Sequence, residues 1–512
     1  MIERLVHHKR HLQLSVLVLA LSLPLSACMV GPDFHKPAPP DVHSYTSKAL
    51  PSRTASSQAS GKAGKSQLFV KGRDIPGEWW RLFGSPEINK LIEQGIKNSP
   101  NLDAAKQALV QAQEGVNVQF GNLLFPALDT NLQGQRQKFV GSTFGGGVSS
   151  SIFNLFNASV NASYALDVFG GNRRTIESLQ AQAENMQFEL MAAYLTLTSN
   201  IVTTSVAIAA YDAQISATKA LIAAQAEQLN ILRKQYKLGG VAKTNVLAQE
   251  TLVEQTRATL PVLQNSLSQS QHMLAVLVGD YPNKKMPRLK LNSLTLPVNI
   301  PVSLPSKLVQ QRPDVRAAEA LLHSASAEIG VATAQMLPSF DITGNFGWAT
   351  GVPSGLFRAI NEAWAYGLQI AQPTFHGGAE FAFRRQMIAA YQQVLAQYKQ
   401  VLLQAFQNTA DSLRALETDA RALKYTKSAE VAARNSLRIA TQQYKDGGVS
   451  YIVLLNAQTQ YQETRLASIQ ATALRFADTA ALFQSLGGGW WNSKTFKCNK
   501  ALNPVNASLT CP

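Results

Sequence analysis

The sequence predicts a membrane protein of mixed α+β class, in which a few strands per chain join an oligomeric β-barrel that long helices continue as a coiled-coil α-barrel. Three observations support this prediction. The chain repeats itself, it carries segments of about ten residues that alternate between apolar and polar, and it contains helical stretches too long for a compact domain. Together they predict a tube rather than a globule.

The composition excludes several other classes. Only 15% of the 512 residues are charged, against roughly 25% in a typical soluble protein. The mean hydropathy of -0.06 argues against a multi-span helical membrane protein. The net charge of +15 could suggest a nucleic-acid partner, but an export signal places the chain outside the cytoplasm. We therefore expect the basic excess to face the cell envelope and predict no nucleic-acid binding.

Residues 1–27 have the pattern of a signal peptide. A basic start precedes an apolar run from Leu12 to about Leu25, which is too short for a comfortable membrane span. The run ends in Leu25-Ser26-Ala27-Cys28, which matches the bacterial lipoprotein box and makes Cys28 the predicted lipidation site. The alternative is an ordinary signal with a chance cysteine. Met29 in place of an Asp favours sorting to the outer membrane.

Residues 28–78 are predicted to form a lipid-anchored N-terminal tether. The part from Pro37 to about Lys71 is rich in Pro and Ser, and no acid lies between Asp41 and Asp74. This composition predicts a flexible basic linker. Contact with anionic lipid or with the cell wall is the alternative interpretation.

The body of the chain is an internal two-fold repeat. Four landmarks recur in the same order at offsets of 207 to 213 residues, among them Gln235–Val241 and Gln443–Val449. The predicted repeats are 79–303 and 304–489, and a tail follows at 490–512. Each repeat is expected to contain a helix, two strands and a long helical hairpin, and the two initial helices are predicted at about 86–120 and 304–335.

Four segments alternate with the period of a β-strand. The strands are predicted at about 124–138, 157–168, 337–350 and 363–374. One face is apolar and the other carries small and polar residues, with aromatic residues near the ends, which is typical of a transmembrane β-barrel. An ordinary half-buried sheet would show the same alternation.

The helices are unusually long. No Pro or Gly interrupts the 66 residues from Asn172 to Lys237, which would span roughly 100 Å as one helix. Residues 379–445 are similar. Heptad spacing in the partner segments, such as Val246, Val253 and Leu260, predicts antiparallel coiled-coil hairpins that turn at Gly-Gly pairs.

Four strands cannot close a barrel, and lipid does not tolerate an open sheet edge. The chain is therefore expected to oligomerise through its sheet. A dimer, a trimer or a tetramer would each satisfy this argument. A polar strand face and helices rich in Gln, Asn and Ser suit a water-filled lumen.

Three motifs resemble those of a known family. Cys28–Pro37 (CMVGPDFHKP) resembles the opening C-x-V-G-P-x-[FY]-x-[KR]-P, and Trp79–Phe83 (WWRLF) resembles W-W-x-x-F. Leu304–Glu319 (LPSKLVQQRPDVRAAE) resembles L-P-x-x-L-x-x-x-R-P-D-[IV]-x-A-A-E. The chain resembles an outer-membrane factor of the TolC/OprM/NodT type, the exit duct of tripartite efflux systems. The resemblance covers Cys28 to about Leu486.

The resemblance implies a homotrimer with a 12-stranded outer-membrane barrel, four strands from each chain, and a periplasmic α-barrel. It implies docking to a periplasmic adaptor and an inner-membrane pump of the RND type. A lipid-anchored location in the outer membrane of a Gram-negative bacterium follows. The rival hypotheses are a duct for type I protein secretion and a structural coiled-coil protein that links the envelope to the cell wall.

The hairpin tips are the predicted working parts. The turn residues, expected to contact the adaptor or merely to cap helices, are Gly239, Gly240, Val241, Gly447, Gly448 and Val449. The candidates for holding the aperture closed are Tyr236, Asn245, Tyr444, Asp446, Ser450 and Asn456. The family often carries Asp where this chain has Asn456, so an acidic ring is weakened or moved here.

The sequence offers no enzyme site. The histidines of the mature chain show no metal-ligand spacing, and no nucleophile or dinucleotide motif is present, so we predict no catalysis, no metal and no cofactor. Cys498 and Cys511 could form a structural disulfide in the oxidising periplasm.

Overall fold

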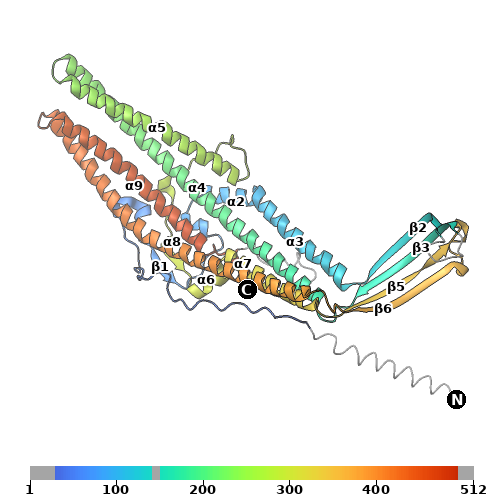
Figure 1. The fold of residues 1–512 in the computed structure, drawn as a ribbon. Coiled ribbons are helices and arrows are strands. Elements are labelled where there is room, and N and C mark those ends of the chain that lie inside the picture. The colour runs from blue at the N-terminus through green and yellow to red at the C-terminus, as the bar shows by residue number, and fades with distance from the viewer. Residues whose placement is uncertain (1–28, 141–149, 494–512) are drawn as a thin grey trace. The chain divides into compact units, whose positions relative to one another are not determined.

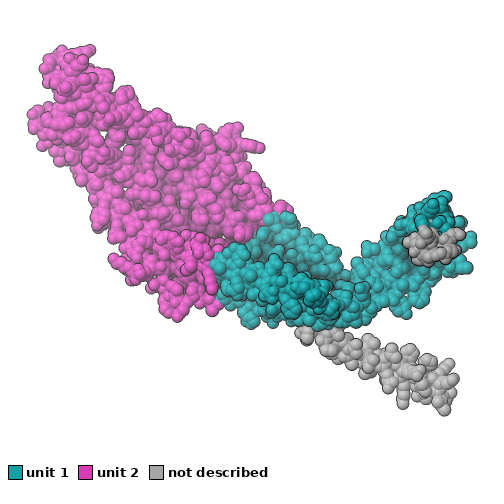
Figure 2. All heavy atoms as spheres, in the orientation of Figure 1, with its two compact units in different colours: residues 1–37, 108–186, 317–398 teal, residues 38–107, 187–316, 399–512 magenta. Residues whose placement is uncertain are grey.

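The computed structural model describes residues 29–140 and 150–493, and the chain forms two compact units (Figure 2). One unit comprises residues 1–37, 108–186 and 317–398, and the second comprises 38–107, 187–316 and 399–512. Each unit takes segments from both predicted repeats. The signal peptide, Cys28 and the two C-terminal cysteines lie outside the described residues.

The first unit contains a four-stranded antiparallel sheet, visible as a group of neighbouring arrows in Figure 1. Its order is β2-β3-β5-β6. The strands are β2 (Ala127–Phe139), β3 (Ser151–Ala165), β5 (Ser339–Thr350) and β6 (Glu362–Ala371). All four predicted strands are therefore present. β3 begins six residues earlier than predicted, because Ile152, Phe153 and Leu155 break the alternation that marked its start.

The register of the sheet separates an apolar face from a polar face. Val160 pairs with Phe346, which pairs in turn with Trp364, while Asn161 pairs with Asn345 on the opposite face. Among residues 29–140 and 150–493, little covers the apolar side chains of this face: Leu132 is 75% exposed and Trp364 is 64% exposed. An apolar face of this kind requires lipid or a partner protein.

The helices match the predicted lengths closely. The long helices are α4 (Gly171–Lys237) and α8 (Ala379–Lys445), each of 67 residues. Their hairpin partners are α5 (Lys243–Leu277) and α9 (Tyr451–Ser485), each of 35 residues. One window of α4 is apolar and long enough to cross a membrane, but 67% of it is buried inside the protein, as expected for a core helix.

Prolines split the two shorter helical regions. The predicted helix over 86–120 is two helices, α2 (Pro86–Asn98) and α3 (Pro100–Leu124). The predicted helix over 304–335 is likewise α6 (Pro305–Gln311) and α7 (Pro313–Ala334). In both places the residue before a proline leaves the helical conformation, because the proline ring clashes with its backbone.

The prediction of a flexible linker over residues 37–71 is wrong for the second half of this segment. Residues Gln58–Gly64 form a 3-10 helix, and β1 (Leu68–Lys71) pairs in parallel with β4 (Asn299–Val302). Gln67 is fully buried, and its Nε2 donates to the carbonyl of Pro297 at 3.2 Å. The composition was misleading because small residues in this segment pack closely: a Cβ on Gly64 would overlap the carbonyl of Ser57.

The second unit holds the main aromatic core. Trp79, in the short 3-10 helix Trp79–Phe83, is fully buried and stacks on Phe483 with ring centroids 5.3 Å apart. Phe83 packs against Phe476. Burial of this many rings contributes on the order of 2 kcal/mol per side chain, so the W-W-x-x-F motif serves to fix the N-terminal segment on α9.

Candidate functional site

The hairpin tips are closed by two equivalent glycine caps. Gly239 and Gly447 have φ of +76° and +73°, in the left-handed region that favours glycine. The next amides complete the motif: Gly240 N–H donates to Gln235 O and Gly448 N–H donates to Gln443 O, both at 2.8 Å. These two bonds, one at each tip, mark a Schellman motif at the end of each long helix. The capping role of the tip glycines is thus a geometric fact.

A buried tyrosine joins the two hairpins just behind the tips. Tyr451, at the start of α9, is 5% exposed, and its hydroxyl donates to Oε1 of the fully buried Gln249 on α5. Tyr444 packs edge-on against it with ring centroids 5.7 Å apart. Burial raises the pKa of both phenols, so they remain neutral donors. No sequence motif pointed to Tyr451 or Gln249 as site residues.

An apolar cluster surrounds this contact. It combines buried residues from all four hairpin helices: Leu229, Leu232, Val246, Val253, Ala440, Tyr451, Leu454 and Ala457. Because each helix contributes to one cluster, separating the hairpins near the tips would expose apolar surface. The cluster stabilises the arrangement of the hairpins seen here.

The predicted aperture residues are spread around the cluster. Tyr444 is half-buried within it, whereas Tyr236 is 45% exposed. Asp446 is exposed and accepts two hydrogen bonds of 3.1 Å from Gln442 on the same helix, so its contacts are local. Asn245 is half-buried, and Ser450 and Asn456 are exposed. The structure therefore brings together Tyr444 and Tyr451, but leaves most of the candidates on the surface of the single chain.

Further along the hairpins, glutamines connect the helices. Gln462 accepts hydrogen bonds from Gln225 on α4 at 3.5 Å and from Thr256 on α5 at 3.0 Å. Gln462 interrupts the apolar heptad row of α9, and these bonds explain why. A polar residue at a core position fixes the register of a coiled coil, because any slip would leave it unpaired.

A buried charged cluster lies where α8, α9 and the N-terminal segment meet in the second unit. Arg475 is fully buried and donates from Nη2 to Lys65 O at 2.6 Å and to Thr54 at 3.2 Å. Asp419 lies beside both Arg475 and Asp478. Burial, and then the neighbouring carboxyl of Asp478, raise the pKa of Asp419 to about 7.

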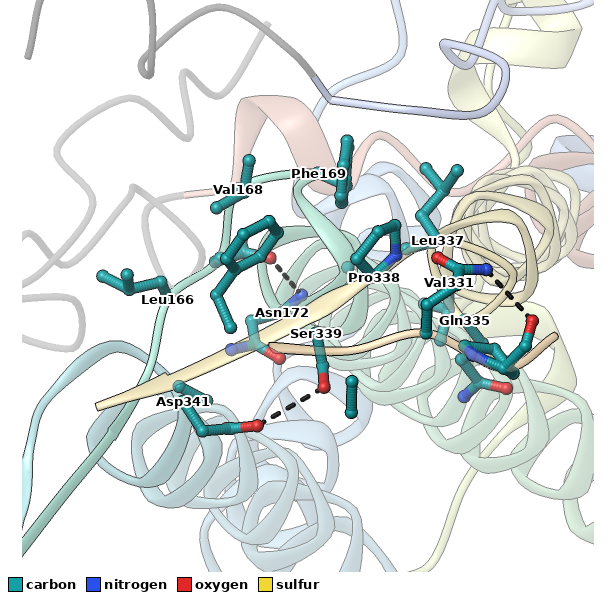
Figure 3. A pocket seen from close by; sticks show the side chains of 18 of the residues that line it. Leu166, Val168, Phe169, Asn172, Val331, Gln335, Leu337, Pro338, Ser339 and Asp341 are labelled. Carbon is teal, nitrogen blue, oxygen red and sulfur yellow. Dashed lines mark hydrogen bonds between the residues drawn. The ribbon is translucent and has the colours of Figure 1, made fainter. Parts of the chain in front are cut away.

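The first unit carries a pocket of about 640 Å³ where the strands meet the helices (Figure 3). Leu166, Val168 and Leu337 line it together with Asn172 and Asp341. Asp167 caps α4 by accepting from the backbone N–H groups of residues 172 and 173, both at 3.0 Å. The pocket is thus framed by helix caps and strand ends.

The segment after Cys28 is fastened to the same unit. Arg174, whose side chain is 2% exposed, forms ion pairs of 2.7 Å with Asp33 and with Glu177. Phe34 stacks on His323 with ring centroids 4.5 Å apart. A Cβ on Gly31 would overlap the backbone of Gly330. The V-G-P-x-[FY] motif is therefore a packing motif that holds the segment after Cys28 on α4 and α7.

The fold and its surfaces define a class: a membrane protein whose uncovered apolar sheet is followed by long helical hairpins, as in channel proteins of the outer membrane. The model of the family described as outer membrane efflux protein matches residues 91–280 and 304–488. The chain belongs to this family, and the resemblance that its three motifs indicated is confirmed. It is an efflux channel of the outer membrane; the family consists of channels and not of enzymes.

Curated relatives agree over most of the chain. The pyoverdine export outer membrane protein OpmQ of Pseudomonas aeruginosa is 26% identical over 422 residues, which are 81% of this chain and 88% of the relative. Nodulation protein T of Rhizobium leguminosarum bv. trifolii is 25% identical over 477 residues, 92% of this chain and 96% of the relative. The toluene efflux pump outer membrane protein TtgF of Pseudomonas putida is 26% identical over 495 residues, 93% and 97% respectively.

Solved structures show the same fold. The outer-membrane channel OprN has a TM-score of 0.80 at 25% identity, and the match covers 90% of this chain and all of that one. The open state of the MtrE channel of Neisseria gonorrhoeae has a TM-score of 0.77 at 24% identity, with 90% and 99% covered.

Proposed function

We propose that the chain works as a homotrimer in which three four-stranded sheets close one 12-stranded barrel and the helical hairpins close an α-barrel beneath it. The observation that carries this proposal is the sheet itself: it has an uncovered apolar face and two unpaired edges, β2 and β6. Lipid can cover the apolar face, but it cannot satisfy the backbone N–H and C=O groups of the two open edges, so the sheet must be continued by other copies.

The paired helix lengths support a two-fold duplication. α4 and α8 have 67 residues each, and α5 and α9 have 35 each. We infer that the halves 79–303 and 304–489 arose from one unit and that three chains supply six similar hairpins. A lumen lined by neutral polar side chains would pass varied solutes without binding them strongly.

The duct is passive in this proposal, and an inner-membrane pump supplies the energy through a periplasmic adaptor. The adaptor contacts the exposed turns, including Gly239–Val241 and Gly447–Val449. Tyr451 and its neighbours hold the hairpins in a closed arrangement until docking separates them. The relatives' names refer to pyoverdine export and to toluene efflux, and we expect small molecules as the cargo here.

Cys28 is the proposed lipid anchor. The fastening of residues 29–37 by Arg174 and His323 supports this role, because an anchored chain end gains from being held at a fixed place on the body. The acyl chains on Cys28 then enter the periplasmic leaflet of the outer membrane and add to the membrane attachment that the barrel provides.

The decisive experiment is reconstitution of the purified mature protein in planar bilayers. We expect a trimer that resists dissociation by detergent and conducts ions in discrete steps. Loss of the acyl chains through Cys28→Ser, with an alternative signal peptide, should leave conductance unchanged because the barrel alone spans the bilayer. A water-soluble and non-conducting protein after delipidation would contradict the proposal and favour a structural coiled-coil protein.

A further inference from the structure

A second pocket lies in the second unit, and none of its lining residues belongs to the hairpin turns or to the four-stranded sheet. Its volume is about 410 Å³, within the range of small-molecule sites. The N-terminal segment 59–63 forms one wall, the loop 291–294 another, and α8 and α9 contribute Lys427 and Arg465. The polar groups among the lining residues include the hydroxyls of Ser60 and Thr472 and the amide of Asn292.

The charge beside this pocket is unbalanced. Glu430, whose side chain is fully buried, forms ion pairs with Lys427 at 2.7 Å, with Arg465 at 2.6 Å and with Arg434. Burial opposes ionisation of this carboxyl, but hydrogen bonds from Lys427, Ser468 and Arg465 outweigh it and lower the pKa of Glu430 to about 2. One carboxylate therefore faces three cations, and among the described residues no second carboxylate forms an ion pair with any of them.

The surplus cations are held in place at the pocket wall. Lys427 and Arg465 both line the pocket, with side chains 17% and 34% exposed. Their shared bond to Glu430 fixes both heads and removes much of the entropy that a flexible cation would lose on binding. Lys62, exposed on the opposite wall, adds a third positive charge.

We propose that this pocket binds a small oxyanion, such as a phosphate or a dicarboxylate. The guanidinium of Arg465 presents a planar fork suited to such a group. Lys62 and Lys427 supply point charges, and the hydroxyls and the Asn292 amide supply neutral donors. The bound anion connects segment 59–63 to α8 and α9, so it stabilises the N-terminal segment against the helical hairpins.

Calorimetric titration of the full mature protein in detergent tests the proposal, with inorganic phosphate and succinate as separate probes at constant ionic strength. We expect saturable binding of at least one probe and none of uncharged succinamide. The matched variants are Lys62→Gln and Lys65→Gln, which remove one exposed charge each from the same segment. Of these two lysines, only Lys62 lines the pocket. K62Q should therefore weaken binding about fivefold or more, and K65Q should not.

Arg434→Gln gives a second control, because Arg434 shares the Glu430 network but does not line the pocket. The affinity of R434Q for the probe should fall by less than that of K62Q, because Arg434 adds to the surplus positive charge but does not line the pocket. The phosphate and succinate arms identify which oxyanion the pocket prefers. Equal weakening by K62Q and K65Q would mean that the anion senses only a diffuse positive surface and would overturn the proposal. Absence of saturable binding by the folded wild-type protein would overturn it as well.

Discussion

The two helical hairpins share one backbone plan but carry different chemistry. Both turn through the same Schellman motif, and residues 208 positions apart correspond. The second hairpin places the buried Tyr451 where the first has the exposed Lys243, and Asp446 where the first has Leu238, which is 86% exposed. The two hairpins thus have the same turn geometry but different side chains: the second contributes the buried Tyr451, and the first contributes Gln249, which accepts its hydrogen bond.

The difference extends along the helices. The cluster of Asp419, Arg475 and Asp478 lies on the second hairpin, and the corresponding positions of the first are Tyr211, Leu267 and Ser270. Of these two sets of positions, only the one on the second hairpin includes a carboxyl whose pKa lies near 7. We expect the stability of the second hairpin to change with pH through this carboxyl.

The largest effect should follow from removing the buried aromatic ring of Tyr451. Tyr451→Ala deletes a buried aromatic side chain and leaves the Gln249 carbonyl without its donor, for a loss of about 3–5 kcal/mol. Its counterpart Lys243→Ala should change stability by less than about 0.5 kcal/mol. Denaturant unfolding measures the first quantity, and bilayer conductance should show more frequent wide openings for Y451A alone. Similar conductance of the two variants would refute the assignment of Tyr451 as the closing contact.

A smaller effect is expected at the turns. Valine at Gly447 or Gly239 must adopt a positive φ, which costs about 1–3 kcal/mol locally, although open space surrounds both glycines. We expect G447V and G239V to assemble normally and to lose export, as scored by drug susceptibility and by trimers on gels. Gly448→Ala is the control, since Gly448 does not have a positive φ.

The two valine variants also test whether the two hairpins differ in their contact with the adaptor. The strain is the same at Gly239 and Gly447, so a difference in export between G239V and G447V would report which hairpin contacts the adaptor more closely. Normal drug resistance in both variants would contradict a docking role for the tips.

The smallest effect concerns pH. The pKa of Asp419 is about 7 in the folded protein, above its ordinary value, so its stabilising protonation is complete at low pH and is lost as the pH rises through about 7. Asp478 and Arg475 face it from α9. We expect thermal stability to fall by on the order of 1 kcal/mol between pH 5.5 and 8, after allowance for partial exposure. Asp419→Asn should flatten this slope, whereas Asn at the exposed Asp446 should not.

Much of this architecture could be predicted from the sequence because its periods are local. Alternation located all four strands, and the absence of Pro and Gly located α4 and α8. The start of β3 was missed because Ile152 and Phe153 are adjacent apolar residues, which no strand period predicts. The packing of segment 58–71 was missed because its composition resembles that of a solvated linker, although its small residues allow close contact.

The hydrogen bond between Tyr451 and Gln249 could not be predicted from the sequence, for a different reason. Tyr451 and Gln249 are about 200 residues apart and meet only when both hairpins have folded and aligned. A heptad assigns Gln249 to a helix face but does not name its partner. The tip glycines, in contrast, were found because their conformation is set within six residues.

The order of the strands has a consequence for the speed of folding. β2–β3 and β5–β6 are neighbours in the sequence and can form as local hairpins within microseconds. β3 pairs with β5 only across the whole of the first helical hairpin, from Ala165 to Asp341 at its nearest pair. Contacts at such separation form slowly, so this central pairing should limit the rate of folding. Until β3 pairs with β5, the chain contains two separate two-stranded sheets with exposed apolar faces and unpaired edges. A chaperone that shields them would raise the yield of assembled channel.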